Sequence, residues 1–192
     1  IAFYGAYFFQ LNNSELFSLF YLQPQVLAFI TPAITMRLWA EEKRSGTIEF
    51  LLTQPIDKRT IVFAKFFSSI AFGLVMLSTT FPLWIYTSFL ANLDNLNIIC
   101  GYFGCFLIIC SFCAIGCAVS SVNKNPITAY LISLFICWGA SFNASIPALN
   151  FQNNYIEFIS GQFGLNNLVY FLSIIFLALL INVSLIQQRR FQ

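Results

Sequence analysis

The sequence predicts an all-α protein, a polytopic bundle of transmembrane helices, and three observations lead to that fold class. The 192 residues are 59% hydrophobic and only 8% charged, whereas a soluble domain carries about 25% charged residues. Apolar runs long enough to cross a bilayer recur along the chain. When these runs are taken as spans, all nine Lys and Arg residues fall on the same side of the membrane. Residues 1–192 are therefore interpreted as a single transmembrane domain.

The apolar runs define the spans in chain order. The first run, residues 1–9, is about half of the roughly 20 residues that a span needs, so we expect the chain to begin inside its first span and the intact protein to have six. Pro24 and Pro32 are expected to bend the second span. The third run is longer than a bilayer requires, and we expect it to tilt, to extend into the interface or to bend near Pro82. The five full spans are predicted at residues 16–36, 61–90, 98–119, 127–146 and 168–186.

The connections between these spans alternate between two sides of the membrane. Every Lys and Arg lies on the side that holds residues 37–60, 120–126 and the tail after 186. Because basic residues accumulate in cytoplasmic loops, this side and the C-terminus are predicted to be cytoplasmic. The opposite side has no basic residue but three acidic ones, which are Glu15, Asp94 and Glu157.

The longest loop on the predicted external side, residues 147–167, is rich in apolar side chains. Phe151, Ile156, Ile159 and Phe163 all fall within it. Irregular backbone at membrane depth needs burial in protein. We therefore expect a re-entrant or interfacial segment there, rather than a free loop.

The cytoplasmic loop, residues 37–60, is the most informative segment. Ten of the sixteen charged residues lie between Arg37 and Lys65. Within the loop, three apolar residues have the i, i+3, i+4 spacing of one helical face, and they are Ile48, Leu51 and Leu52. This pattern predicts a short amphipathic helix that lies along the membrane surface.

The ends of that helix are also marked in the sequence. Ser45 is predicted as its N-cap and Pro55 as its stop. Gly46 marks a corner between this helix and the charged residues before it. Asp57 is predicted to cap the next membrane span.

Two interpretations of this loop compete. It is either an interfacial helix that rests on anionic lipid, or a docking element for a soluble protein. The run Glu41-Glu42-Lys43-Arg44 mixes acid and base, and this mixture suits protein recognition, because a lipid surface selects basic residues alone.

The residues around this loop resemble a known family. Residues 32–55 read PAITMRLWAEEKRSGTIEFLLTQP and are similar to the segment between the second and third spans of ABC-2 type permeases, the membrane subunits of a class of ATP-binding-cassette transporters. The resemblance is strongest to the subgroup that contains gliding-motility-associated permeases and permeases of nitrous-oxide reductase maturation. It extends to residues 65–66, 123–126 and 168–173.

This resemblance implies a partner and a place of action. It implies a subunit of the bacterial inner (plasma) membrane that pairs with a second copy or a paralogue, binds cytoplasmic ATPase subunits and takes part in export. In that picture residues 37–60 form the coupling helix. The positions that match the family motif, and are expected to contact the ATPase, are Glu41, Glu42, Ser45, Gly46, Thr47 and Glu49.

The chain carries no motif for chemistry of its own. Walker A, G-x-S-x-G and H-E-x-x-H patterns are absent from the sequence, so we expect no catalytic or cofactor site and no nucleic-acid partner, with ATP hydrolysis in a partner subunit. No acidic residue lies at the middle of a span, and this argues against an ion-coupled transporter. The alternative function is a non-transporting scaffold that recruits a cytoplasmic protein through the same loop.

Six Cys residues lie inside the apolar runs. Cys110, Cys113 and Cys117 share one helical face, and the first two form a C-x-x-C pattern, so a metal or redox site is one interpretation. The chain has no His, and Cys also serves as a small apolar packing residue. We prefer packing, because Gly101, Gly104 and Gly116 make the same span rich in small residues.

Overall fold

The structure is a computed structural model, and it describes residues 15–82, 84–85, 95–142, 150–159, 161 and 164–188. The helices in chain order are α2 (Glu15–Thr35), α3 (Arg37–Ser45), α4 (Thr47–Thr53), α5 (Lys58–Ser78), α7 (Asn95–Val122), α8 (Pro126–Phe142), α9 (Phe151–Ile159) and α10 (Leu165–Gln188). Within the described residues there is no strand, and the all-α prediction is confirmed. The predicted first span, residues 1–9, lies outside the described part of the chain.

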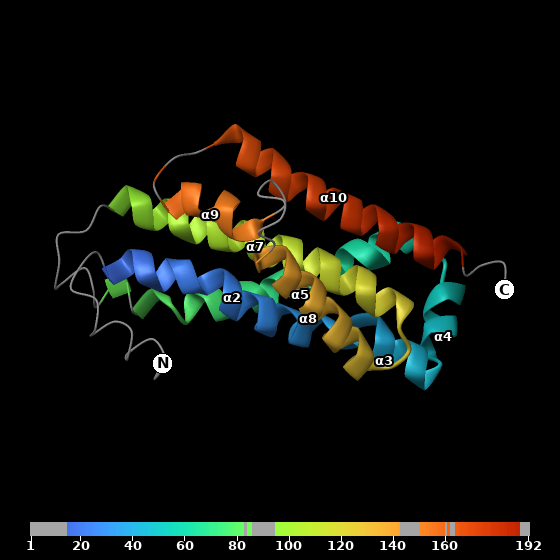
Figure 1. Ribbon diagram of the computed structural model, residues 1–192. Helices are drawn as coiled ribbons and strands as arrows, with labels where there is room; N and C mark the ends of the chain where they lie inside the picture. Colours follow the sequence, from blue (N-terminus) through green and yellow to red (C-terminus); the bar gives the residue numbers. More distant parts are fainter. Residues whose placement is uncertain are drawn as a thin grey trace.

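In the described part of the chain, five long helices run side by side and form the bundle, and they are α2, α5, α7, α8 and α10 (Figure 1). Three of them, α5, α7 and α10, are long and apolar enough to cross a membrane, and α8 is a shorter apolar helix. The helices coincide with the ranges 16–36, 98–119, 127–146 and 168–186 to within a few residues. In the range 61–90, α5 ends at Ser78 and a turn follows at Thr79 and Thr80, while residues 86–90 lie outside the described part of the chain. The number of spans in the intact protein and the side that faces the cytoplasm stay predictions.

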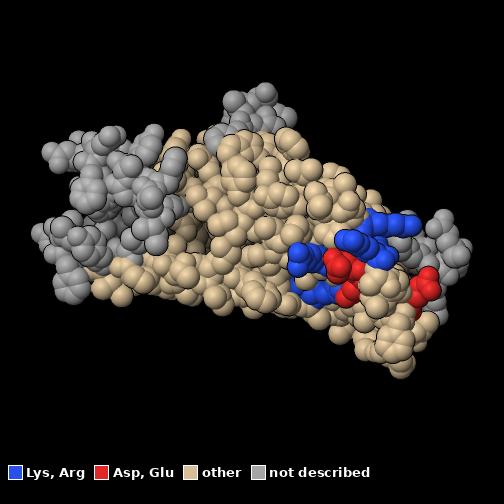
Figure 2. Space-filling model, turned by 90° about the horizontal axis from the view of Figure 1, so that it is seen from below, with Lys and Arg blue, Asp and Glu red and all other residues tan. Residues whose placement is uncertain are grey.

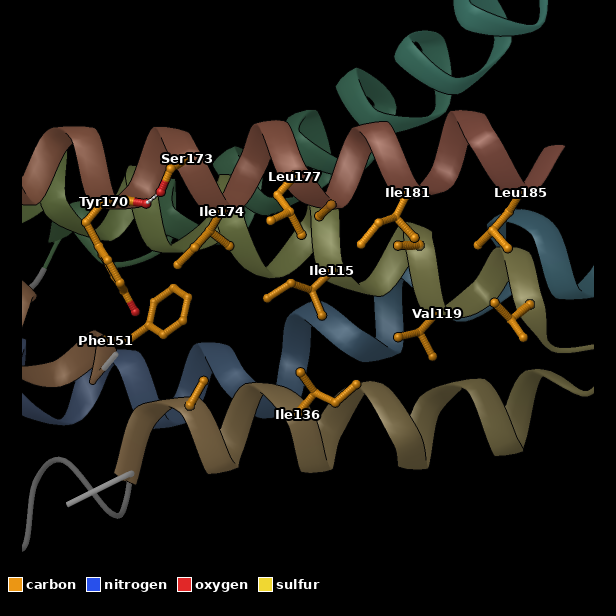
Figure 3. A pocket seen from close by; sticks show the side chains of 14 residues that line it. Ile115, Val119, Ile136, Phe151, Tyr170, Ser173, Ile174, Leu177, Ile181 and Leu185 are labelled. Atoms are coloured by element: carbon orange, nitrogen blue, oxygen red, sulfur yellow. Dashed lines mark hydrogen bonds between the residues drawn. The ribbon is translucent and has the colours of Figure 1, made fainter. Parts of the chain in front are cut away.

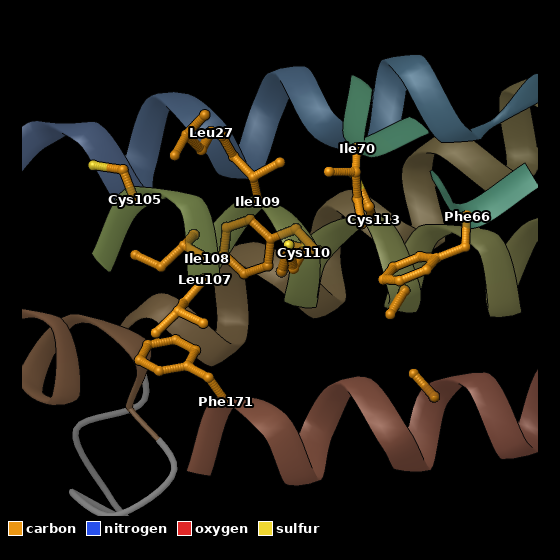
Figure 4. Packing of buried hydrophobic residues seen from close by; sticks show 14 of the residues in the cluster. Leu27, Phe66, Ile70, Cys105, Leu107, Ile108, Ile109, Cys110, Cys113 and Phe171 are labelled. Carbon is orange, nitrogen blue, oxygen red and sulfur yellow. The ribbon is translucent and has the colours of Figure 1, made fainter. Parts of the chain in front are cut away.

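Helix α7 is the centre of the bundle. It contacts α2, α3, α5, α8, α9 and α10, and Figure 4 shows its side chains packed against Leu27 of α2, Phe66 of α5 and Phe171 of α10. The 28 residues of α7 include no charged side chain. A helix that is apolar on every side is stable when it is buried, and the composition of α7 explains its central place.

Small residues let the neighbours approach α7 closely. A Cβ added at Gly104 would lie 2.8 Å from the ring of Tyr155 in α9, and one added at Gly101 would lie 3.1 Å from Phe20 in α2. At Gly73 of α5, an added Cβ would overlap Ile109 of α7. The close packing that the small residues predict is therefore present along α7.

The six cysteines are free and buried. The Sγ of Cys105 lies 2.9 Å from the Tyr155 hydroxyl, and Cys110 and Cys113 belong to the hydrophobic core. Among the described residues, no three His, Cys, Asp or Glu side chains come together in a group that could hold a metal ion. The packing interpretation fits this arrangement.

The outer faces of the bundle are apolar. Large hydrophobic side chains are exposed along α5, α8 and α10, and Phe67, Phe135 and Phe176 are examples. A soluble monomer rarely exposes so continuous an apolar surface. On the face shown in Figure 2, the acidic and basic side chains instead gather at one end of the molecule.

The segment before the last span is folded against the bundle. Helix α9 contacts α7, α2 and α8, and its residues Phe151, Tyr155 and Phe158 are buried. At its end, Asn167 Nδ2 donates a hydrogen bond of 2.5 Å to Glu157 Oε2. The described part of residues 147–167 is thus packed against protein, in line with the expectation that it is not a free loop.

Candidate functional site

The residues predicted to contact an ATPase lie at one end of the bundle. Helices α3 and α4 and the first turn of α5 meet there, and α4 crosses the direction of the long helices (Figure 1). The charges seen in Figure 2 gather at this same end. The site therefore has two parts and the contacts that hold them to the bundle. The hinge is the break between α2 and α3 at Met36, and the corner is the turn between α3 and α4 at Gly46.

The hinge interrupts the helix at Met36. The Ser120 hydroxyl of α7 accepts hydrogen bonds from the backbone N–H groups of Trp39 (3.1 Å) and Ala40 (3.2 Å) and donates one of 3.0 Å to the Met36 carbonyl. Backbone groups in the first turn of a helix need partners from outside that helix. A single buried hydroxyl on another helix thus fixes where α3 leaves α2.

The hinge also rests directly on α7 one turn before Ser120. A Cβ added at Gly116 would overlap Thr35 Oγ1, so only Gly permits this approach. Gly116 and Ser120 are four residues apart and share one face of α7. This face of α7 therefore holds the hinge through both packing and hydrogen bonds.

The corner between α3 and α4 is made by Gly46, whose φ is 75°. Nothing lies within 4 Å of the position that its Cβ would occupy, so the left-handed backbone, and not crowding, favours Gly here. Gly46 is the N-cap of α4, and Ser45 is the last residue of α3. The prediction that Ser45 caps the short helix is wrong: its hydroxyl donates to the Glu41 carbonyl (2.9 Å) and meets the Thr47 hydroxyl (2.9 Å).

The predicted end of the short helix, α4, and the predicted start of the next long helix, α5, are found in the structure. Helix α4 ends at Thr53, and Gln54 is extended, because the residue before a proline such as Pro55 is disfavoured in the helical region. Asp57 is the N-cap of α5, although its side chain makes no capping bond. Its carbonyl instead accepts from the N–H of Thr60 (2.9 Å).

A partly buried ion pair joins α3 to α5. The Lys65 ammonium lies 2.5 Å from Glu42 Oε1, and the Lys65 side chain is only 15% exposed. The ammonium also donates to the Leu38 carbonyl and lies 4.2 Å from the centre of the Trp39 ring. Trp39 is fully buried, so the charge of Lys65 is held between a carboxylate, a carbonyl and an aromatic face.

The six predicted contact residues divide into two groups. Glu42 turns toward the bundle and pairs with Lys65. The other five are exposed on the outer side of α3 and α4, and they are Glu41, Ser45, Gly46, Thr47 and Glu49. The structure thus brings five of the six together on a surface that another protein can reach.

The structure adds an exposed residue that the sequence analysis did not select. Phe50 of α4 is 71% exposed, whereas Ile48 of the same helix is buried and Leu51 packs against the core. Residues two positions apart point to different sides of a helix. Once Ile48 is assigned to the inner side of α4, Phe50 is therefore expected on the outer side, and this spacing is the sequence signal for it. Phe50 is therefore exposed on the outer side of α4, next to Glu49.

A wide apolar groove runs between α7, α8 and α10 (Figure 3). Its volume is about 750 Å³, and its lining includes Ile115, Val119, Ile136 and Ile181. At one end Phe151 of α9 packs against the Tyr170 ring, with 5.6 Å between ring centres. The groove carries no charged side chain, so nothing in its lining selects one chemical class of ligand.

In a comparison with protein families, the family described as ABC-2 family transporter protein matches residues 21–190 of this chain. This range includes the hinge, the corner, most of α2 and the whole of α5, α7, α8 and α10. Neither curated proteins nor solved structures gave a match.

Proposed function

Because this chain belongs to the ABC-2 transporter family, we propose that it is the membrane-spanning permease subunit of an ATP-binding-cassette exporter, driven by a separate cytoplasmic ATPase. The surface around Phe50 is the single observation that carries the ATPase contact. Phe50 is an exposed aromatic residue on a short helix, and aromatic residues are enriched in the cores of protein–protein interfaces.

The contact surface is proposed to comprise Phe50 and the exposed residues of the corner, which are Glu41, Ser45, Gly46, Thr47 and Glu49. Glu42 acts within the chain in this account. Its ion pair with Lys65 holds α3 against α5, so Glu42 sets the angle at which the surface is presented.

Movement of the ATPase subunits is proposed to reach the membrane through this corner. Helices α3 and α4 are joined by one left-handed residue, Gly46, and α3 is fixed to α7 by Ser120 and to α5 by Lys65. A push on α4 is therefore passed through α3 to α7 and, by the Lys65 ion pair, to α5 as a rigid-body displacement. Since α7 contacts most other helices, it distributes that displacement over the bundle.

The finer assignments rest on the resemblance of residues 32–55. It supports a place in the subgroup of gliding-motility-associated and nitrous-oxide-reductase-maturation permeases, and assembly with a second copy or a paralogue. It also supports location in the bacterial inner membrane, and the distribution of Lys and Arg supports a cytoplasmic position for the corner and the C-terminus.

Replacing Phe50 with Ala should weaken binding of the ATPase subunit. Truncation of a hot-spot aromatic costs about 2 kcal/mol or more, which is tenfold or more in affinity. We expect the ATPase to be lost from the complex when the chain is purified from native membranes in mild detergent. The measurement is the ratio of ATPase to chain in the purified complex.

Phe135 offers a matched control. It is also 71% exposed, but it lies on the apolar flank of α8. Phe135→Ala should keep the wild-type ratio, because lipid and not the ATPase covers that side chain. Equal ratios for the wild type and Phe50→Ala would remove Phe50 from the contact.

A further inference from the structure

A second groove lies between α5 and α10. Its volume is about 670 Å³, and α5 lines it with Arg59 and Phe63. On α10 the lining residues recur every three or four positions from Leu172 to Gln187. At 1.5 Å per residue this stripe is about 22 Å long, and one edge of it, at Leu179, belongs to the core.

The two ends of this groove differ in chemistry. The lining from Leu172 to Val183 is apolar, whereas Arg59, Ser184 and Gln187 lie at the end near the corner. Beside that end, Lys58 Nζ donates a hydrogen bond of 3.4 Å to the Ile186 carbonyl and links the two helices. The groove is therefore long, apolar and closed at one end by polar side chains.

Arg59 is the cation at the polar end. Its side chain is exposed. None of the described acidic residues forms an ion pair with Arg59, and the ion pair found among them joins Glu42 to Lys65. A guanidinium group presents planar paired donors that match the geometry of a phosphate. The polar end of the groove thus offers a phosphate-binding group at the edge of an apolar channel.

We propose that this groove binds an anionic phospholipid, with one acyl chain along α10 and the headgroup phosphate at Arg59. The hydrocarbon core of a bilayer is about 30 Å thick, so a stripe of about 22 Å accommodates the acyl chain of one leaflet. The basic end lies on the predicted cytoplasmic side, where anionic lipids attract Lys and Arg. This proposal requires the membrane topology but not the ATPase contact.

The bound lipid would act as a bridge between α5 and α10. The two helices are in contact, and the groove runs between their facing side chains. An acyl chain in the groove makes van der Waals contacts with both helices, and the phosphate neutralises Arg59. We therefore expect anionic lipid to raise the thermal stability of the purified chain.

The test uses native mass spectrometry and thermal unfolding of the full chain in detergent, with phosphatidylglycerol or phosphatidylethanolamine added. The wild type should retain one phosphatidylglycerol and gain thermal stability from it, and phosphatidylethanolamine should have a smaller effect. Arg59→Gln should lower the affinity for phosphatidylglycerol about fivefold, which corresponds to about 1 kcal/mol for one basic residue at the membrane surface. Lys124→Gln, which removes an exposed charge from the turn before α8, should leave it unchanged.

A second pair of variants tests the channel itself. Leu180 lines this groove and Leu177 lines the neighbouring one between α7, α8 and α10. Leu180→Trp should displace the lipid while Arg59 stays in place, and Leu177→Trp should not. Equal retention of the two lipids, or retention in Arg59→Gln equal to the wild type, would overturn the proposal. If the chain instead forms a dimer that excludes lipid, and Leu180→Trp disrupts that dimer, the groove binds a second copy of the chain and not a lipid.

Discussion

Replacing Glu42 with Ala should destabilise the chain more than any change of an exposed charge in the same loop. The substitution leaves the Lys65 ammonium without its carboxylate in a largely buried place, and the loss of a partner for a buried charged group costs about 1–3 kcal/mol. In a protein of this size each kcal/mol lowers the melting temperature by about 2–4 °C. The measurement is thermal unfolding of the purified chain in detergent.

Two further variants separate the ion pair from a general effect of charge. Glu41 is the exposed neighbour of Glu42, and Glu41→Ala should leave the melting temperature within about 1–2 °C of the wild type, as surface substitutions do. Combining Glu42→Ala with Lys65→Met should restore part of the loss, because no unpaired charge then remains buried. If Glu41→Ala and Glu42→Ala had the same effect, the pair would not hold α3 to α5.

The second large effect is expected at Ser120. Ser120→Ala removes the acceptor of two backbone N–H groups and the donor to the Met36 carbonyl. Each buried group left without a partner costs about 1–3 kcal/mol. We expect a lower melting temperature and, in addition, faster hydrogen exchange of the Trp39 and Ala40 amides.

Ser111 is a matched control on the same helix. It is buried like Ser120, but its hydroxyl donates only to the Leu107 carbonyl of its own helix, at 2.9 Å. Ser111→Ala should therefore change stability little and leave exchange at Trp39 unchanged. Unchanged exchange in Ser120→Ala would show that the hinge does not depend on this hydroxyl.

The bundle could be predicted from the sequence because its signal is local. Each long helix is an apolar run, and lipid imposes helical structure on such a run. The hinge could not be predicted, since Met36 and Ser120 are 84 residues apart. Pro32 signals only that the second span bends, whereas the place of the break depends on Gly116 and Ser120 in another helix.

The candidate site was predicted in part. The spacing of Ile48 and Leu51 indicated the inner side of α4, and both pack inward. Ser45 was assigned as the N-cap by side-chain preference, but Gly46 occupies that position because only Gly adopts the left-handed corner without strain. The inward turn of Glu42 depends on Lys65, which belongs to a different helix, so no local pattern could reveal it.

Coupling through the corner is most directly tested by the rate of ATP hydrolysis in proteoliposomes that contain the chain and its ATPase subunits. The account predicts that the wild-type chain alters this rate, that Phe50→Ala abolishes the effect, and that Phe135→Ala preserves it. It also predicts that the chain with Ser120→Ala still binds the ATPase but alters the rate of ATP hydrolysis less than the wild type does. The reason is that the hinge no longer passes the movement of the ATPase subunits to the bundle. An ATPase that binds the chain and hydrolyses ATP at the same rate with and without it would contradict the account and identify the chain as a scaffold.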